Sequence, residues 1–181
     1  MGPIEIVWGS LIVLFGFIGL VRGFLREIGV TTIMAFLLFI LTFFQKQFTA
    51  GLDMLVAMVR LSPPDGSEAN LLRFSVYLVL IGLVAFISYQ GETLTFQGRP
   101  IPGALGMLLS LIIGLWNGYL IIGSLWHYMN VLGYPISLWG LFQQPLSPVA
   151  SVMVTLLPPA LIPAFGFLAI AAFLIFMRVI K

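Results

Sequence analysis

The sequence has no cysteine and very little charge. None of the 181 residues is cysteine, and only 8% of them are Asp, Glu, Lys or Arg. Without thiols the chain can form no disulfide, no zinc–thiolate site and no iron–sulfur cluster. Soluble domains carry about 25% charged and about 45–50% apolar residues. This chain is 61% apolar, with a mean hydropathy of +1.15. The composition therefore predicts that lipid surrounds most of it.

Charged residues are also missing from the centre of every long apolar run. Proton relays, voltage sensors and ion-coupled carriers usually need such groups, so the pattern disfavours a pump. Catalysis is disfavoured because the chain has one histidine, no cluster of metal ligands, no nucleophile elbow and no phosphate-binding glycine loop. The net charge of +2 is too small for nucleic-acid binding. We therefore expect a non-enzymatic membrane protein with no metal site and no nucleic-acid partner.

Five apolar runs remain when the chain is divided at its charges and prolines. A charge at the bilayer centre costs about 2.5–3.5 kcal/mol, and a spanning helix needs about 20 apolar residues. Proline interrupts helices, so Pro158, Pro159 and Pro163 place the start of the last span near residue 160. The predicted fold is all-α, a single membrane domain over 1–181 with about five transmembrane helices, at residues 6–21, 28–44, 74–89, 103–129 and 160–177.

The connection after the second run contains a further amphipathic segment. Its apolar residues recur at helical spacing: Phe48, Leu52, Leu55, Val56 and Val59. The segment is too short to cross a bilayer, so residues 48–61 are predicted to form a helix lying in the interface.

The distribution of lysine and arginine predicts an orientation. Five of the eight cations fall on one predicted side of the membrane: Arg22, Arg26, Arg99, Arg178 and Lys181. The opposite side has three, diluted by acidic residues, and the segment 130–163 has none. The positive-inside rule then puts the N-terminus outside and the C-terminus in the cytoplasm.

Small residues form two strips that predict a helix–helix contact. Gly106, Ser110, Gly114 and Gly118 recur every four residues on the fourth run, and the first run carries Gly16, Gly19 and Gly23. Residues four apart share one helix face, so each strip leaves a groove that a neighbouring backbone can enter. We expect the two strips to contact each other within one chain. Packing against another subunit, in a homo-oligomer or with a different membrane protein, is the alternative.

Polar residues near these strips provide the candidate sites. Asn117, beside the glycine strip, is expected to hydrogen-bond across helices, or alternatively to contact a substrate or ion. Arg22, Arg26 and Glu27 crowd a turn of about six residues, where they could set orientation, face lipid phosphates or dock a cytoplasmic partner. The single histidine, His127, could ligate a tetrapyrrole metal, but one imidazole without a companion ligand is a weak signal. Any bound cofactor stays unknown at this stage.

Residues 16–27, which read Gly-Phe-Ile-Gly-Leu-Val-Arg-Gly-Phe-Leu-Arg-Glu, resemble the opening signature of the colicin V production protein family. In that family an Arg-Gly-Phe segment is followed closely by Arg-Glu. The glycine-spaced fourth run is similar to the family's fourth helix, and Pro145-Leu146-Ser147-Pro148 is similar to part of its outer C-terminal stretch. The likeness covers residues 6–158, and 159–181 adds a further C-terminal helix.

The resemblance implies a multi-pass protein of a bacterial inner membrane, linked to colicin V production or export and to envelope homeostasis, with no established enzymatic activity. Its partners would be the lipid bilayer and a membrane protein or a second copy of the chain. Two other interpretations fit the composition. One is an accessory or structural subunit of a large respiratory or photosynthetic complex, and the other is a small pore or exporter.

Overall fold

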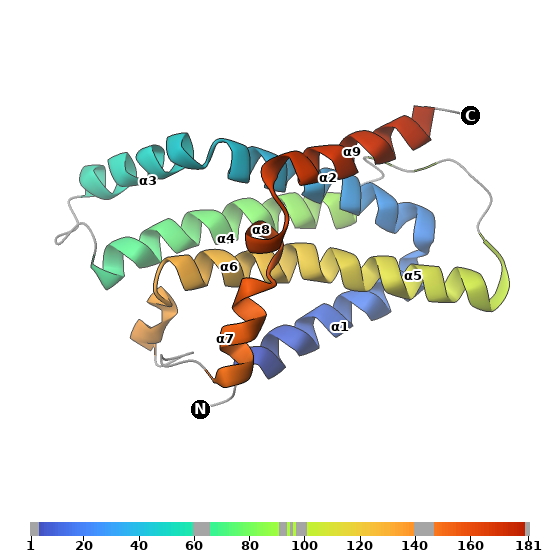
Figure 1. The fold of residues 1–181 in the computed structure, drawn as a ribbon, viewed down its shortest axis with the longest axis horizontal. Helices are drawn as coiled ribbons and strands as arrows, with labels where there is room; N and C mark the ends of the chain where they lie inside the picture. Colours follow the sequence, from blue (N-terminus) through green and yellow to red (C-terminus); the bar gives the residue numbers. More distant parts are fainter. Residues whose placement is uncertain are drawn as a thin grey trace.

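The computed structural model of the protein describes residues 4–59, 66–90, 94, 96, 101–139 and 147–179. Over these ranges the chain is helical and contains no strand. Four helices, at four of the five predicted spans, are long and apolar enough to cross a membrane, and they run along the long axis of an elongated bundle (Figure 1). They are α1 (Ile4–Arg22), α2 (Phe24–Phe43), α4 (Ser67–Gln90) and the continuous helix Gly103–Val131, formed by α5 (Gly103–Gly118), η1 (Tyr119–Gly123) and α6 (Ser124–Val131).

Three of the long helices start earlier than the apolar runs predicted, α1 at Ile4 instead of residue 6 and the other two by a larger margin. α2 begins at Phe24 instead of residue 28, and α4 begins at Ser67 instead of residue 74. Each of these two larger extensions includes an acidic residue in its first turn, Glu27 in α2 and Glu68 in α4. The positive end of the helix dipole favours a carboxylate there, so a helix can include charges at which a hydropathy pattern would end.

The fourth long helix changes its winding in the middle. Its turn Tyr119–Gly123 is π-helical, with α-helix on both sides. Gly123 faces Pro158, because a Cβ built on this glycine would lie 2.8 Å from Cδ of the proline. A single π-helical turn leaves the helix continuous, which is why a simple apolar run predicted it as one span.

The amphipathic segment forms α3 (Gln45–Val59), a helix close to the predicted 48–61; residues 60 and 61 lie outside the described ranges. Its buried residues, Leu52 and Val56, are one helical turn apart, and the helix contacts α4. Figure 1 draws α3 roughly in line with α2, along the bundle. The structure therefore packs this helix alongside α4 and not across the end of the bundle, because its apolar stripe has a protein surface to cover.

The C-terminal part is more broken than the sequence predicted. After η2 (Pro135–Trp139) come the short helices α7 (Pro148–Thr155) and α8 (Pro158–Leu161), and α9 covers Ala164–Val179. The break that precedes the last helix falls at residues 162–163, so this helix begins at Ala164 and not near residue 160. α9 packs against α2 and buries Phe167 and Ala171. Its 16 residues give about 24 Å of helix, which is shorter than the other four.

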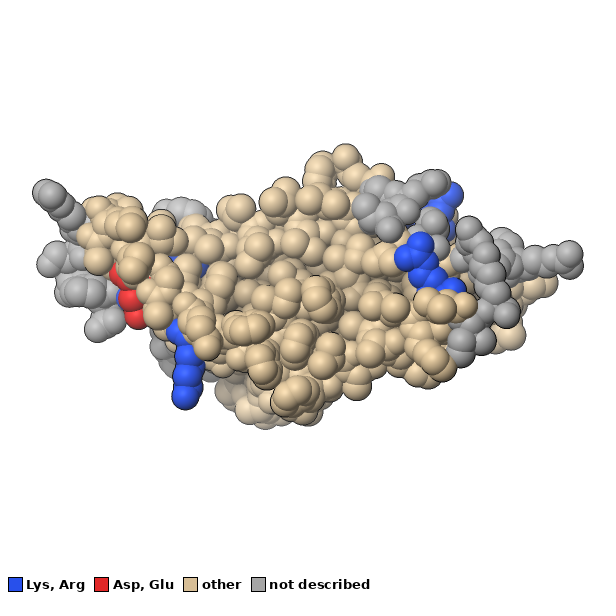
Figure 2. Space-filling model, turned by 90° about the horizontal axis from the view of Figure 1, so that it is seen from above, with Lys and Arg blue, Asp and Glu red and all other residues tan. Residues whose placement is uncertain are grey.

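Charge and apolar surface are separated along the bundle. In Figure 2 the lysines, arginines and acidic residues show at the two ends, with a broad uncharged surface between them. Large apolar side chains on that surface remain exposed, among them Phe17 (58%), Val79 (64%) and Phe86 (57%). The interior is closed by Met34, Leu38, Ile81 and Leu120, each fully buried. A bundle that is apolar both inside and outside fits a lipid environment.

Candidate functional site

Glycines bring α1 and α5 into backbone contact. A Cβ built on Gly19 would lie 2.8 Å from Cα of Gly114, and one on Gly118 would lie 2.8 Å from Cβ of Phe15. Such distances are too short for real Cβ atoms, so only glycine fits at these positions. The contacts run in opposite directions along the two helices, which makes the pair antiparallel. Gly16 completes the contact, facing the side chain of Leu115.

The other members of the two strips have different roles. Gly106 faces the carbonyl of Ile101, which belongs to the chain leading into α5. Ser110 donates its hydroxyl to the Gly106 carbonyl and turns its own carbonyl toward Gly19. A Cβ built on Gly23 would meet no atom within 4 Å, so this glycine does not take part in the contact. Gly23 connects α1 to α2 with φ +87°. The α1–α5 contact is therefore shorter than the predicted strips, because it excludes Gly23 and Gly106.

Gly23 also corrects the expected turn. The six residues predicted to form a turn are reduced to this one glycine, since α1 ends at Arg22 and α2 begins at Phe24. Glycine adopts positive φ without the clash that a Cβ would cause. The sharp reversal places Arg22, at the end of one helix, beside Glu27, in the first turn of the next.

Glu27 is fully buried and lies at the centre of a polar cluster. Its Oε1 accepts a hydrogen bond from Nη1 of Arg22 at 2.9 Å. Its Oε2 accepts from Nδ2 of Asn117 at 2.8 Å and from the hydroxyl of Tyr89 at 3.0 Å. We call these residues, together with Thr31, the Glu27 cluster. Both carboxylate oxygens are paired, which a buried charge requires.

Asn117 joins α5 to α2 through both ends of its amide. Its Nδ2 also donates to the backbone carbonyl of Glu27 at 2.9 Å, and its Oδ1 accepts from the Thr31 hydroxyl at 2.7 Å. Asn117 is fully buried and Thr31 is 2% exposed. The predicted hydrogen bond across helices is present, and both the nitrogen and the oxygen of this amide bind residues of α2.

Arg22 connects the cluster to α4. Its Nη2 donates to the backbone carbonyl of Tyr89 at 3.1 Å, and its guanidinium carbon lies 4.5 Å from the centre of the Tyr89 ring. An arginine over an aromatic face gains a cation–π attraction. The Arg22 side chain is 18% exposed, so a substantial part of its charge is shielded from solvent. The cluster thus ties α1, α2, α4 and α5 together at one end of the bundle.

Sequence reasoning identified three of the five cluster residues but not their arrangement. Glu27 was expected in a short turn together with Arg22 and Arg26, whereas it lies inside α2 as the buried centre of the site. Thr31 lies four residues after Glu27, on the same helix face, and this spacing was a usable signal. Nothing in the sequence indicates that Tyr89, 62 residues away from Glu27, completes the site.

His127 and Arg26 lie outside the cluster. His127 is partly buried in α6, with its ring 5.4 Å from that of Tyr128. Among the described residues, no group of three His, Cys, Asp or Glu side chains could hold a metal ion. Arg26 is exposed, and it makes no hydrogen bond or ion pair with any residue in the described part of the chain.

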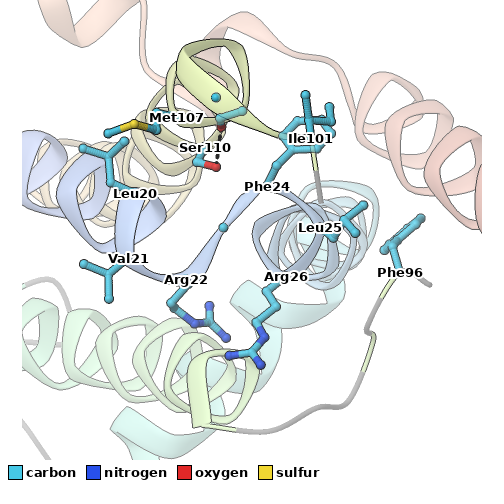
Figure 3. Close-up of a pocket in the computed structure, with 13 residues that line it drawn as sticks. Leu20, Val21, Arg22, Phe24, Leu25, Arg26, Phe96, Ile101, Met107 and Ser110 are labelled. Carbon is cyan, nitrogen blue, oxygen red and sulfur yellow. Dashed lines mark hydrogen bonds between the residues drawn. The ribbon is translucent and has the colours of Figure 1, made fainter. Parts of the chain in front are cut away.

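A cleft of about 670 Å³ lies beside the cluster, at the end of the bundle where α1 ends and both α2 and α5 begin. We call this the Arg22 end. Leu20 and Val21 line the cleft from α1, and Met107 lines it from α5. Figure 3 shows that the side chains of Arg22 and Arg26 extend to the same side of the cleft. The site is therefore a cleft of mixed polar and apolar lining, with two cations at its edge.

Comparison with other proteins gives no relative to compare these residues with: no family model, curated protein or solved structure matches the chain. The function must therefore be argued from the fold and from this site.

Proposed function

We propose that this protein is a non-enzymatic, multi-pass scaffold of a bacterial inner membrane, which docks a ligand or partner at its Arg22 end. Its role would be like that of the colicin V production proteins, in toxin export or envelope homeostasis. The likeness of residues 16–27 to that family supports the role, and the apolar helices support the location.

The observation that supports the scaffold function is that the polar groups of Glu27 and Asn117 are hydrogen-bonded to other residues of the chain. Polar groups inside a membrane protein usually mark a pathway for ions or substrates. Here the carboxylate of Glu27 and the amide of Asn117 bind other side chains and the backbone of neighbouring helices. Such a network favours one rigid arrangement of four helices over an open path.

Five crossings form part of the proposal, with α9 as the fifth. α9 packs along α2, which lets a helix of about 24 Å pair with a longer neighbour. In this arrangement the Arg22 end lies in the cytoplasm, and the start of α4 lies outside.

Single-cysteine labelling tests the location and the number of crossings, because the natural chain has no cysteine to interfere. With a membrane-impermeant maleimide, Arg26→Cys and Arg178→Cys should react only from the cytoplasmic side, and Ser67→Cys only from outside. Reaction of Arg178→Cys from outside would reduce the count to four crossings. Recovery of the protein in the soluble fraction, or labelling of residues 26 and 67 from one side, would overturn the proposal.

A further inference from the structure

We propose that the cleft at the Arg22 end binds an anionic phospholipid, with Arg26 and Arg22 holding its phosphate. The apolar wall of the cleft would hold the first part of an acyl chain. This inference rests on the proposed membrane location and names the ligand of the proposed docking site.

Among the residues that the structure describes around the cleft, positive and negative charges do not balance. Arg22 and Arg26 both line it, whereas Glu27 is the nearby carboxylate and is already bound to Arg22. One positive charge is left over, on Arg26, whose guanidinium has no partner within the described ranges. A guanidinium presents parallel N–H groups that match phosphate oxygens, so a phosphate is the complementary anion.

The apolar residues that line the cleft favour a lipid over a free anion as its ligand. Val21 is 88% exposed and Met107 is 64% exposed, although both are apolar and line the same cleft as the arginines. A free phosphate would leave these side chains uncovered, whereas an acyl chain below a headgroup would cover them. The pairing of cations with exposed apolar walls therefore fits an amphipathic ligand.

The place of the cleft in the bundle agrees with this chemistry. Figure 2 shows lysines and arginines at the two ends of the uncharged surface, where a membrane would have its headgroups, and the cleft lies at one of these ends. The chain reverses there at Gly23, which has no side chain to fill the space beside the reversal. A headgroup can therefore approach the reversal between α1 and α2 closely.

The binding of phosphatidylglycerol to the purified full chain in detergent micelles tests the inference, with native mass spectrometry as the readout. Arg26→Gln should weaken binding about fivefold, as expected for one cation near a headgroup. Arg26→Lys should keep most of the binding. Arg178→Gln is the matched control, since Arg178 is an exposed cation in the last turn of α9 and does not line the cleft. This control should bind as the natural chain does.

Three results would overturn the inference. Equal losses in Arg26→Gln and Arg178→Gln would indicate general attraction to cations. Displacement of phosphatidylglycerol by equimolar glycerol phosphate or inorganic phosphate would identify a free-anion site. Binding of phosphatidylcholine as tight as that of phosphatidylglycerol would remove the charge argument. Carbonate extraction of membranes distinguishes these failures from failure of the proposed function, because a chain that stays in the membrane but binds no lipid keeps the scaffold and loses only this ligand.

Discussion

Replacement of Glu27 by alanine should destabilise the bundle more than any substitution of an exposed charge. The change removes three hydrogen bonds, at 2.9, 2.8 and 3.0 Å, and leaves the 18% exposed Arg22 without its counter-charge. Three neutral bonds of the kind measured between membrane helices would be worth about 2 kcal/mol. Removing one partner of a buried ion pair costs about 3–5 kcal/mol, and we expect a loss of stability in that range.

The free energy of unfolding can be measured by titrating the protein in mixed micelles with a denaturing detergent and following tryptophan fluorescence. A double-mutant cycle with Glu27→Gln, Arg22→Gln and the double variant isolates the interaction of the two side chains. Because the two groups are in contact, we expect a coupling of about 1–3 kcal/mol.

The Asp53–Arg73 ion pair provides the matched control. Its N···O distance is also 2.9 Å, but the Asp53 side chain is 55% exposed. The Arg73 side chain is 10% exposed, but without Asp53 it keeps a hydrogen bond from Nη1 to Oδ1 of Asn70 at 2.7 Å. Asp53→Asn should therefore cost less than about 1 kcal/mol. If the Glu27 and Arg22 substitutions cost no more than this control, or add without coupling, the cluster does not hold the four helices together.

Two further predictions concern the contact between α1 and α5. Gly19→Leu should destabilise the protein by about 1–3 kcal/mol or more, because its side chain would clash with the backbone of α5. Gly9→Leu is the control on the same helix: a Cβ built on Gly9 would meet nothing within 4 Å, so the same unfolding titration should show little change. Equal effects of the two substitutions would contradict the contact. Gly114→Leu should likewise destabilise the protein, because a Cβ built on Gly114 would lie 2.6 Å from the Phe15 carbonyl oxygen and 2.9 Å from Cα of Gly19. Gly82→Leu is its control, since a Cβ built on Gly82 in α4 would meet nothing within 4 Å, and the same unfolding titration should show little change for it.

The long helices could be predicted because they depend on local composition. The runs at 6–21, 28–44, 74–89 and 103–129 are each continuous in sequence, and the structure has a long helix at each. The boundaries at Phe24 and Ser67 could not be predicted from hydropathy, since the helix end stabilises the carboxylates of both first turns and Glu27 also has partners from other helices. The break at residues 162–163 depends on how α8 and α9 pack, which a proline count cannot decide.

The candidate site divides in the same way. The four-residue spacing of Gly114 and Gly118 indicated a groove, because side-chain size is a property of the sequence itself. That Gly23 and Gly106 fall outside the contact depends on where α1 ends and on the path of the chain before α5. The ion-pair partner of Glu27 could not be predicted from the sequence either. Arg26 is adjacent in sequence, but neighbours along a helix point in different directions, and the carboxylate binds Arg22 instead.

By itself the sequence determined the solvent of this protein, its helical class and the positions where helices can approach closely, since these follow from composition and from periodicity within one helix. Only the tertiary structure decided that Arg22, Glu27, Thr31, Tyr89 and Asn117 form one cluster. It also decided that a cleft lies beside this cluster, with a cation that has no partner among the described residues. The physical reason is that a buried charge must find its partners in space. Residues as far apart as Glu27 and Asn117, separated by 90 positions, meet only once the helices have packed.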